Sequence, residues 1–274
     1  MIVLCTGCRS GFGLLIAVEA ARAGHTVYAG LRDLETREDL DRATKGLDVR
    51  PVQLDVLDRL QHEEVVERIL GEHGRLDALI NNAGIALGGF QEQIEEDELR
   101  RLFDVNVFSP WALTKRCLPT MREQRAGIVI NVSSMAGRQA MPGLGAYAGS
   151  KFALEGMTEA LRHELRPFGV RVVLVEPGPY KTDIFGRNRR TARESHEAGG
   201  PYARMQARME KLVEKMEARM GDPQEGADLV VELLQDPSPR LRYPLGPGVQ
   251  ARLWARRLLP FQGYEKVIER VVGF

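Results

Sequence analysis

Thr6-Gly7-Cys8-Arg9-Ser10-Gly11-Phe12-Gly13 is the stretch of sequence that decides the fold. It follows an apolar run at 2–6 and leads into helical periodicity at 12–23, which predicts a strand, a glycine-rich turn and a helix in that order. Glycines in such a turn permit a tight bend and let the N-terminus of the helix approach a pyrophosphate group. The Gly-x-x-x-Gly-x-Gly spacing differs from the commoner dinucleotide fingerprint, but its position directly after the first strand favours a cofactor loop over an ordinary turn.

The alternation of strand and helix patterns continues from this turn to residue 176, as in repeated βαβ units around a parallel sheet. The predicted strands are 2–6, 26–31, 49–54, 76–81, 127–132 and 170–176. The predicted helices are 12–23, 59–71, 96–103, 105–123 and 147–168. A chain of 274 residues suits one large α/β domain. We therefore expect a single Rossmann-type domain, a doubly wound parallel sheet of about seven strands with helices on both faces.

The pattern changes after Pro177. A polar, basic stretch precedes a predicted helix at 203–220 with methionines on one stripe, and an excursion of this length is typical of a lid or binding loop. A solvated basic loop with a core-covering helix is the alternative. We expect a cofactor and catalytic core over 1–182, a substrate-binding loop and helix over 183–222, and C-terminal helices with a last strand over 223–274.

Two local features are predicted within the C-terminal part. Asp222 is expected to cap a helix whose first turn holds Pro223, with Glu225 closing a capping box. The last short strand is expected near Leu241–Leu245.

Composition excludes several classes of function. The chain carries 38 basic and 38 acidic residues, so it has no global basic field for nucleic acid. No apolar run reaches the length of a membrane span, and Met1 leads directly into Ile2-Val3-Leu4 without a charged signal-sequence region. We expect a cytoplasmic protein with no integral membrane segment.

The three cysteines do not form a disulfide framework. Cys5 and Cys8 have Cys-x-x-Cys spacing, but no second cysteine pair or histidine cluster completes a tetrahedral zinc site. We expect no metal, and we interpret Cys117 as a small core residue.

Unusual sequence gathers at the carboxyl ends of the predicted strands, the edge where open parallel sheets bind ligands. Asn81-Asn82-Ala83-Gly84 follows the fourth strand and is suited to line a cleft and to brace neighbouring strand ends. Asn131-Val132-Ser133-Ser134 ends the fifth strand in two hydroxyl groups. Glu176-Pro177-Gly178-Pro179-Tyr180-Lys181-Thr182 makes a turn after the sixth. Together these motifs predict one site along one edge of the sheet.

Tyr147 and Lys151 lie four residues apart, which places a phenol and an ammonium group on one face of a predicted helix. A neighbouring ammonium group favours the ionised phenol, so we expect Lys151 to lower the pKa of Tyr147 from its usual value of about 10. The pair alone is a weak motif, and its interpretation depends on the strand-end motifs around it.

Taken together, these motifs resemble those of the short-chain dehydrogenase/reductase family, in order and at the family's spacing over about residues 1–182. The matching positions are Thr6–Gly13, Asp55, Asn81–Gly84, Asn106, Ser134, Tyr147 with Lys151, Pro177-Gly178 and Thr182. The glycine turn and Tyr28-Ala29-Gly30-Leu31-Arg32-Asp33 resemble the hydroxysteroid and retinol dehydrogenase branch in particular.

The resemblance implies an oxidoreductase with a catalytic tetrad of Asn106, Ser134, Tyr147 and Lys151. Tyr147 would exchange a proton with the substrate oxygen as hydride moves to or from nicotinamide. Ser134 would hydrogen-bond the carbonyl oxygen, with Ser133 as the rival hydroxyl. Lys151 would lower the pKa of Tyr147 and hold the nicotinamide ribose, while Asn106 would hold a water that links Lys151 to solvent.

The resemblance also implies a dinucleotide site. Its expected residues are Gly7, Arg9, Ser10, Gly11, Phe12, Gly13, Arg32, Asp55, Val56, Asn82, Ala83, Gly84, Tyr147, Lys151, Pro177, Gly178 and Thr182. The second strand ends in Leu31-Arg32, where an NAD enzyme usually places an acid, so Arg32 with Arg9 predicts NADP(H) over NAD(H). Asp33 is the complication, because a shift of one residue would present its carboxylate to the ribose.

On the substrate side, the resemblance favours a bulky apolar alcohol or ketone such as a steroid or retinoid. Ser134 and Tyr147 would contact it, and Phe185 with the methionine-bearing helix would line an adaptable pocket. Two alternatives stay open: a non-catalytic NADP(H)-binding redox sensor, and epimerisation or dehydration on the same fold.

Association with further copies is predicted from the Tyr147 helix. Gly149, Ala153, Gly156 and Ala160 make a small-residue face on it, and in the family this helix and the one before it form the subunit contact, so we expect a homodimer or homotetramer. For the arginine-bearing segment 248–274, we favour packing against the domain over lying on a membrane surface.

Overall fold

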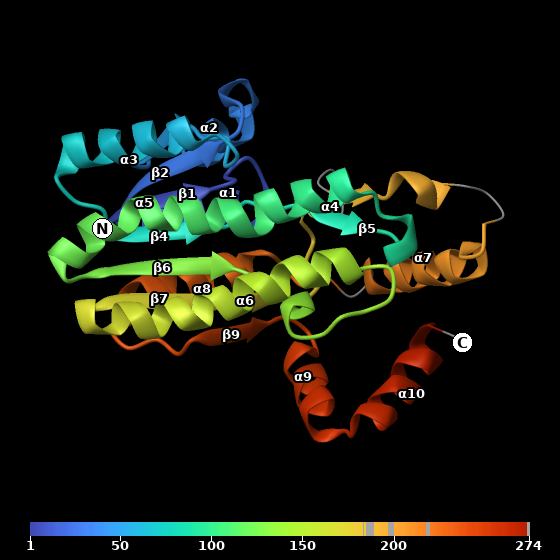
Figure 1. The fold of residues 1–274 in the computed structure, drawn as a ribbon. Coiled ribbons are helices and arrows are strands. Elements are labelled where there is room, and N and C mark those ends of the chain that lie inside the picture. The colour runs from blue at the N-terminus through green and yellow to red at the C-terminus, as the bar shows by residue number, and fades with distance from the viewer. Residues whose placement is uncertain (183, 185–188, 197–199, 218–219, 273–274) are drawn as a thin grey trace.

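The computed structural model describes residues 1–182, 184, 189–196, 200–217 and 220–272. Its main sheet has seven parallel strands in the order β3-β2-β1-β4-β6-β7-β9 (Figure 1). These strands are β1 (Ile2–Thr6), β2 (Thr26–Leu31), β3 (Val49–Gln53), β4 (Ala78–Asn81), β6 (Gly127–Val132), β7 (Val170–Pro177) and β9 (Arg242–Leu245). The doubly wound parallel sheet predicted from the sequence is confirmed.

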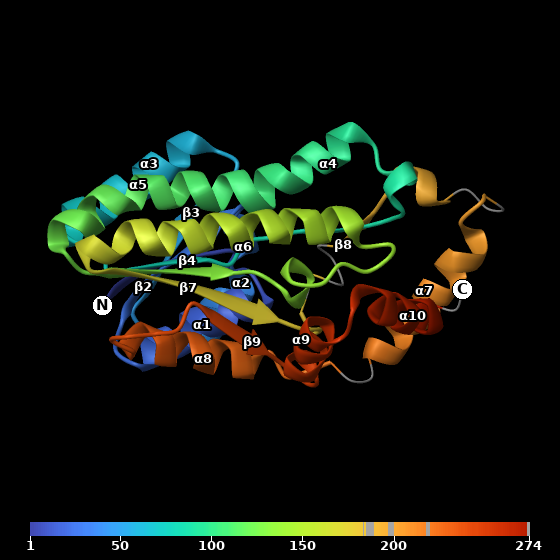
Figure 2. The ribbon, with the colours of Figure 1, turned by 60° about the horizontal axis from the view of Figure 1, so that its bottom comes forward.

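The helices lie on both faces of this sheet (Figure 2). In chain order they are α1 (Gly11–Arg22), α2 (Glu38–Ala43), α3 (Arg59–His73), α4 (Glu96–Phe103), α5 (Ser109–Gln124), α6 (Gly145–Leu165), α7 (Ala203–Glu217), α8 (Gln224–Gln235), α9 (Val249–Leu258) and α10 (Phe261–Val272). Helices α3, α5 and α6 cover one face, and α1 and α8 cover the other.

Two apolar cores result, because successive strand residues point to opposite faces. Leu79 packs with Ile69 and Leu113 beneath α3 and α5, whereas the next residue, Ile80, packs with Ile16 and Val230 beneath α1 and α8. Strands buried on both sides read as continuous apolar runs, which is why their positions can be predicted from the sequence.

The strand order places the site. The chain builds β1, β2 and β3 outward, then returns to add β4 on the other side of β1, with Cys5 of β1 lying between Ala29 and Ile80. Open α/β sheets bind ligands at such a switch point, beside the carboxyl ends of the strands.

Several elements differ from the prediction. Residues 104–108 form a π-helical turn that joins α4 to α5, so the two predicted helices are continuous. The short helix α2 was not predicted, nor were β5 (Ala86–Gly88) and β8 (Arg189–Thr191), which pair in parallel outside the main sheet. Three-residue strands carry too little pattern to be found from periodicity.

The predicted capping box at Glu225 is wrong. The Glu225 carboxylate accepts a hydrogen bond from the Tyr180 hydroxyl (2.9 Å) instead of turning back to the helix start. Asp222 does accept from the backbone N–H of Gln224 (3.0 Å). The buried Tyr180, which is remote in sequence, therefore binds the Glu225 carboxylate that a capping box would use.

None of the helices in the described part of the chain is both long and apolar enough to pass through a lipid bilayer.

Candidate active site

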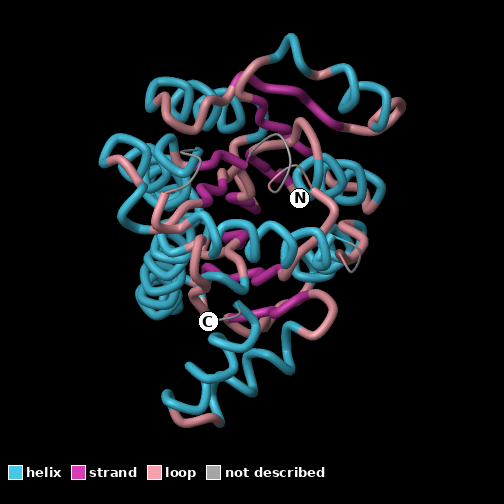
Figure 3. The backbone as a smooth tube through the Cα atoms, turned by 90° about the vertical axis from the view of Figure 1, so that its right-hand side faces the viewer, coloured by secondary structure: helices cyan, strands magenta, loops and turns pink. Residues whose placement is uncertain are grey.

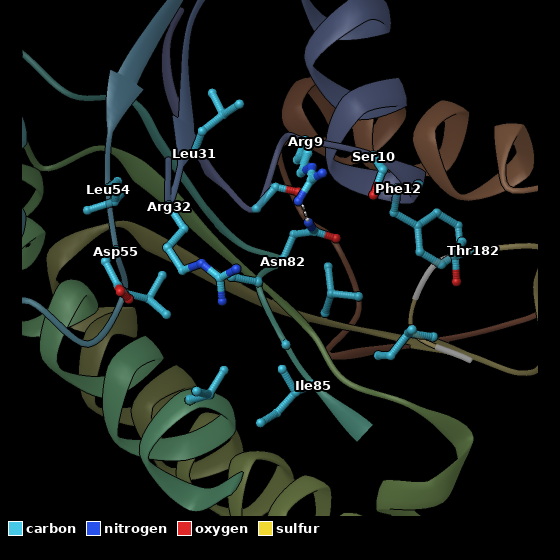
Figure 4. A pocket seen from close by; sticks show the side chains of 18 of the residues that line it. Arg9, Ser10, Phe12, Leu31, Arg32, Leu54, Asp55, Asn82, Ile85 and Thr182 are labelled. Atoms are coloured by element: carbon cyan, nitrogen blue, oxygen red, sulfur yellow. Dashed lines mark hydrogen bonds between the residues drawn. The ribbon is translucent and has the colours of Figure 1, made fainter. Parts of the chain in front are cut away.

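A cavity of about 310 Å³ opens at the carboxyl edge of the sheet, on the switch point between β1 and β4 (Figure 4). All the residues predicted to hold the cofactor line it except Gly13. They arrive from the turns after β1, β2, β3, β4 and β7 and from α6. The sequence motifs that lie far apart along the chain therefore meet in one place.

Gly13 acts one layer behind the cavity. A side chain at Gly13 would collide with the carbonyl oxygen of Gly7 and the amide of Asn82. Gly7 itself has φ +73°, and a Cβ there would lie 3.0 Å from the Ala83 backbone. These glycines let α1 pack directly on the turn and leave a cradle open above it, which fits a pyrophosphate at the helix N-terminus.

A hydrogen-bonded brace joins the ends of β1 and β4. The Asn82 side chain donates to the carbonyl oxygens of Thr6 (2.9 Å) and Gly7 (3.3 Å). In return, the Thr6 hydroxyl accepts from the backbone N–H groups of Asn82 and Ala83, both at 3.0 Å. The bracing expected of the Asn-Asn-Ala-Gly motif is confirmed, and it joins two strand ends at the floor of the cavity.

The end of β2 presents arginine. Arg32 lines the cavity while its carbonyl oxygen accepts from the Gln53 side chain (2.6 Å), and Figure 4 shows Arg32 and Arg9 reaching over the pocket. Asp33 also borders the cavity, but its carboxylate accepts from the backbone N–H of Glu35 (3.0 Å) and caps the turn at Leu34–Thr36. Neither Arg9 nor Arg32 forms an ion pair within the described residues. Two guanidinium groups therefore border the cavity, while the Asp33 carboxylate is hydrogen-bonded to its own turn.

Tyr147 and Lys151 lie on α6, and each residue is only 3 % exposed. Burial raises the pKa of Tyr147 to about 12, and a hydrogen bond with Ser134 lowers it only in part. Burial lowers the pKa of Lys151 to about 8, opposed by the charge of Glu155. The prediction that Lys151 lowers the pKa of Tyr147 is wrong for this structure, because burial disfavours both charged forms.

The position of the Lys151 ammonium group explains this outcome. Its Nζ donates to the carbonyl oxygen of Val132 (2.9 Å) and lies 6.0 Å from the centre of the Tyr147 ring. The Ser134 hydroxyl is the neighbour that lowers the pKa of the phenol. It accepts from the backbone N–H of Ala136 (3.1 Å) and donates to the Pro177 carbonyl (3.5 Å). This effect on the phenol favours Ser134 over its rival Ser133, although Ser133 lines the cavity and Ser134 does not. The Ser133 hydroxyl is buried beside Gly137 and has no partner among the described residues.

Asn106 occupies the π-helical turn between α4 and α5 and is almost fully buried. Its side chain accepts from the backbone N–H of Ile85 (3.0 Å) and donates to the Ile85 carbonyl (2.9 Å) and to Ser150 on α6 (3.0 Å). A Cβ on Gly84 would lie 3.4 Å from Asn106 Oδ1 and 3.8 Å from Lys151 Nζ. Asn106 thus joins three elements beside Lys151; its role in holding a water stays a prediction.

Some cavity residues were missed from the sequence. Arg101 on α4 and Arg190 on β8 border the cavity. Each lies next to another arginine in the sequence, and nothing in those runs indicates which arginine faces a site. Tyr180 was also missed as a wall residue. Its buried ring contacts Phe12 edge-on at 5.2 Å, and an aromatic residue inside a proline-glycine turn was the available signal. Phe185, predicted to touch substrate, lies outside the described residues.

Comparison with known proteins agrees with this site. Residues 1–193 match the family described as short chain dehydrogenase. The chain belongs to the short-chain dehydrogenase/reductase family. Such enzymes are oxidoreductases acting on alcohol and ketone groups with NAD(P).

Two curated relatives illustrate its neighbourhood. A 3-ketodihydrosphingosine reductase of Bacteroides thetaiotaomicron is 35 % identical over 91 % of this chain and 89 % of the relative. The 17-beta-hydroxysteroid dehydrogenase type 1 of Homo sapiens is 34 % identical over 88 % of this chain and 76 % of the relative.

Two solved structures are similar over nearly the whole chain. A short-chain dehydrogenase from Streptomyces avermitilis has a TM-score of 0.83 and 36 % identity, covering 93 % of this chain and 92 % of that one. A metagenomic short-chain oxidoreductase in complex with NADP has a TM-score of 0.70 and 26 % identity, covering 90 % and 97 %.

Proposed function

We propose that this protein is an NADP(H)-dependent oxidoreductase that interconverts a bulky apolar ketone and its alcohol. The observation that carries the proposal is that Tyr147 and Lys151 line the same cavity as a glycine turn and two arginines, Arg9 and Arg32.

The side chains divide the chemistry between them. Bound NADP(H) supplies the hydride donor or acceptor. Tyr147 is protonated well above neutral pH, so it donates a proton to the substrate oxygen in the reduction direction. Ser134 holds the same oxygen by a hydrogen bond, which contributes on the order of 3 kcal/mol to lowering the barrier. Lys151, fixed by the Val132 carbonyl, binds the cofactor ribose beside them.

Arginine supports NADP(H) over NAD(H). A 2′-phosphate accepts charge-assisted hydrogen bonds from guanidinium groups, and Arg32 and Arg9 are placed at the end of β2 and in the glycine turn to supply them. The Asp33 carboxylate, which would favour a ribose hydroxyl, is bound to its own turn.

The surroundings of Tyr147 support an apolar substrate. The ring lies in a cluster with Ala86, Leu87 and Leu102, against which Ile85 and Ile184 also pack. Of these residues, Ile85 and Ile184 line the cavity, and aliphatic lining favours hydrocarbon over charged groups. The names of the two curated relatives, which refer to a steroid and a sphingoid base, agree with a lipid ketone.

A homodimer built on α5 and α6 completes the proposal. Phe108, Trp111, Phe152 and Met157 are large apolar residues exposed on the segment 108–165. The small-residue face is open as well, because a Cβ on Gly156 would meet nothing within 4 Å. Four large exposed apolar residues on two helices support an interface between copies of the chain.

The test is the oxidation of NADPH with a panel of steroid, retinoid, sphingoid and aromatic ketones. We expect turnover with one apolar class, and we expect Tyr147→Phe to lower kcat/KM by about 10²- to 10⁴-fold while the Kd for NADPH is kept. Tyr243→Phe, outside the cavity, is the matched control. Binding of NADPH without turnover across the panel would support the sensor alternative instead.

A further inference from the structure

Helices α9 and α10 form a hairpin that projects from the body beyond β9 (Figures 1 and 3). Its base is anchored: Val249 is fully buried, and its side chain lies 2.5 Å from where a Cβ on Gly178 would stand. The second helix, α10, lies beside α7 (Figure 2). The segment therefore packs against the domain, as predicted, at Val249 and where α10 contacts α7.

The far end of the hairpin is apolar and exposed. We define the hairpin tip as Trp254, Leu258, Leu259 and Phe261. Leu258 is 72 % exposed, Phe261 59 % and Trp254 51 %, and Trp254 and Leu258 are one helical turn apart. Five of the eleven large apolar residues exposed in the described part of the chain lie between 254 and 267, so this surface is concentrated and not scattered.

Arginines surround the tip. Arg252, Arg256 and Arg257 are the charged residues of 249–264, and that stretch contains no aspartate or glutamate. Arg257 lies 5.9 Å from the Trp254 ring, and Arg256 lies 5.4 Å from the Phe261 ring. None of the three makes an ion pair within the described residues. In a chain of zero net charge, this is a local basic surface.

We propose that the hairpin tip docks on a lipid bilayer whose surface carries anionic headgroups. Trp and Leu side chains enter the boundary between headgroups and acyl chains, while the arginine heads stay at the level of the lipid phosphates. A second copy of the chain is a poorer partner, because the same three arginines would meet across a two-fold contact. The surface of α5 and α6 proposed for dimerisation is a different one.

Sedimentation of the full-length protein with vesicles tests this. One vesicle is pure phosphatidylcholine and the other contains about one third phosphatidylserine. We expect binding to the anionic vesicles that weakens as salt rises. Arg257→Gln should weaken it about five-fold, since one basic residue near such a surface contributes about 1 kcal/mol.

Leu258→Asp should abolish the binding, and Leu60→Asp is its matched control. Leu60 is 68 % exposed on α3, remote from the hairpin, so the control adds the same charge at an equally exposed leucine. Unchanged thermal melting and NADPH affinity would show that both variants fold.

Two results would overturn the proposal. One is binding that is equal for Leu258→Asp and Leu60→Asp, or equal for the two vesicle types. The other is a halved molecular mass of Leu258→Asp in light scattering without vesicle binding by the parent protein, which would assign the tip to a second copy.

Discussion

At the scale of single residues, burial affects the pKa of a titratable group more than a charged residue one helical turn away does. Tyr147 and Lys151 are four residues apart, yet burial moves the pKa of each toward its neutral form. Sequence spacing predicts which face a side chain shares. It does not reveal the depth of burial, which depends on Leu87, Leu102 and other residues of remote elements.

Arg32→Ala should lower kcat/KM for NADPH by ten-fold or more and leave the value for NADH nearly unchanged. The reason is the loss of one or two charge-assisted hydrogen bonds to the 2′-phosphate, at about 1.5–3 kcal/mol each. Initial rates with both cofactors measure the effect. Arg37→Ala is the control, since Arg37 pairs with Asp41 on the surface. A parent enzyme that prefers NADH would contradict the assignment.

Glu176 should make the protein less stable as pH rises. Its buried carboxyl group, 3.0 Å from Arg138 and 3.3 Å from Arg242, has a pKa raised to about 7 by burial and then by Glu155. The fold therefore binds a proton that the unfolded chain releases near pH 4.5. Stability from this group is complete below about pH 4.5 and is lost as pH rises through 7.

The loss in unfolding free energy between pH 5 and 8 is on the order of 2 kcal/mol, and Glu176→Gln should remove it. Tm measured across this pH range tests the difference. Glu159→Gln is the comparison, because Glu159 contacts the same Arg242 but is exposed and has a lowered pKa. A parent protein whose Tm rises from pH 5 to 8 while that of Glu176→Gln does not would refute the assignment.

At the scale of elements, α1 and α8 approach closely because Gly226 has no side chain. A Cβ there would overlap the ring of Phe12, which borders the cavity and packs edge-on against Tyr180. Gly226→Ala should cost about 1–3 kcal/mol of unfolding free energy and weaken NADPH binding, because the Phe12 ring must move.

Chemical denaturation and titration with NADPH measure the two effects of that substitution. Gly71→Ala in α3 is the control, since a Cβ there meets nothing within 4 Å and alanine favours a helix. If both alanines have the same effect on stability, close packing at Gly226 is not the reason.

Most elements follow from local pattern. The strands at 2–6, 26–31 and 127–132 have the predicted bounds because each is a buried apolar run. The failures have non-local causes. The Glu225 carboxylate is taken by Tyr180, and the π-helical turn at Asn106 is held by bonds to Ile85 and Ser150 from other elements.

At the scale of the whole molecule, the exposed apolar face of α5 and α6 predicts a particle of at least twice the 30.6 kDa chain mass. Phe152→Glu should yield monomers, because a carboxylate on this face would be buried unpaired in the dimer. Light scattering at micromolar concentration measures the mass. Phe168→Glu serves as the control on another exposed phenylalanine, and a monomeric parent protein would rule out the dimer.

The candidate site as a whole was more predictable than its substrate side. Residues that contact a dinucleotide follow the ends of strands, so Gly7, Asn82 and Thr182 were placed from order along the chain. Arg101 and Arg190 come from a helix face and a short strand outside the main sheet. Their place in the cavity is a property of tertiary packing.

The pairing of β5 with β8 has a kinetic consequence. Strand β5 begins two residues after Gly84, and the backbone N–H of Ala192 donates to the Gly88 carbonyl (2.8 Å), so the segment after β7 is hydrogen-bonded to the edge of the cavity. We expect a displacement of that edge on dinucleotide binding to move Arg190, which pairs with Leu87 in the ladder and borders the cavity. We therefore expect the dinucleotide to enter first and to leave last.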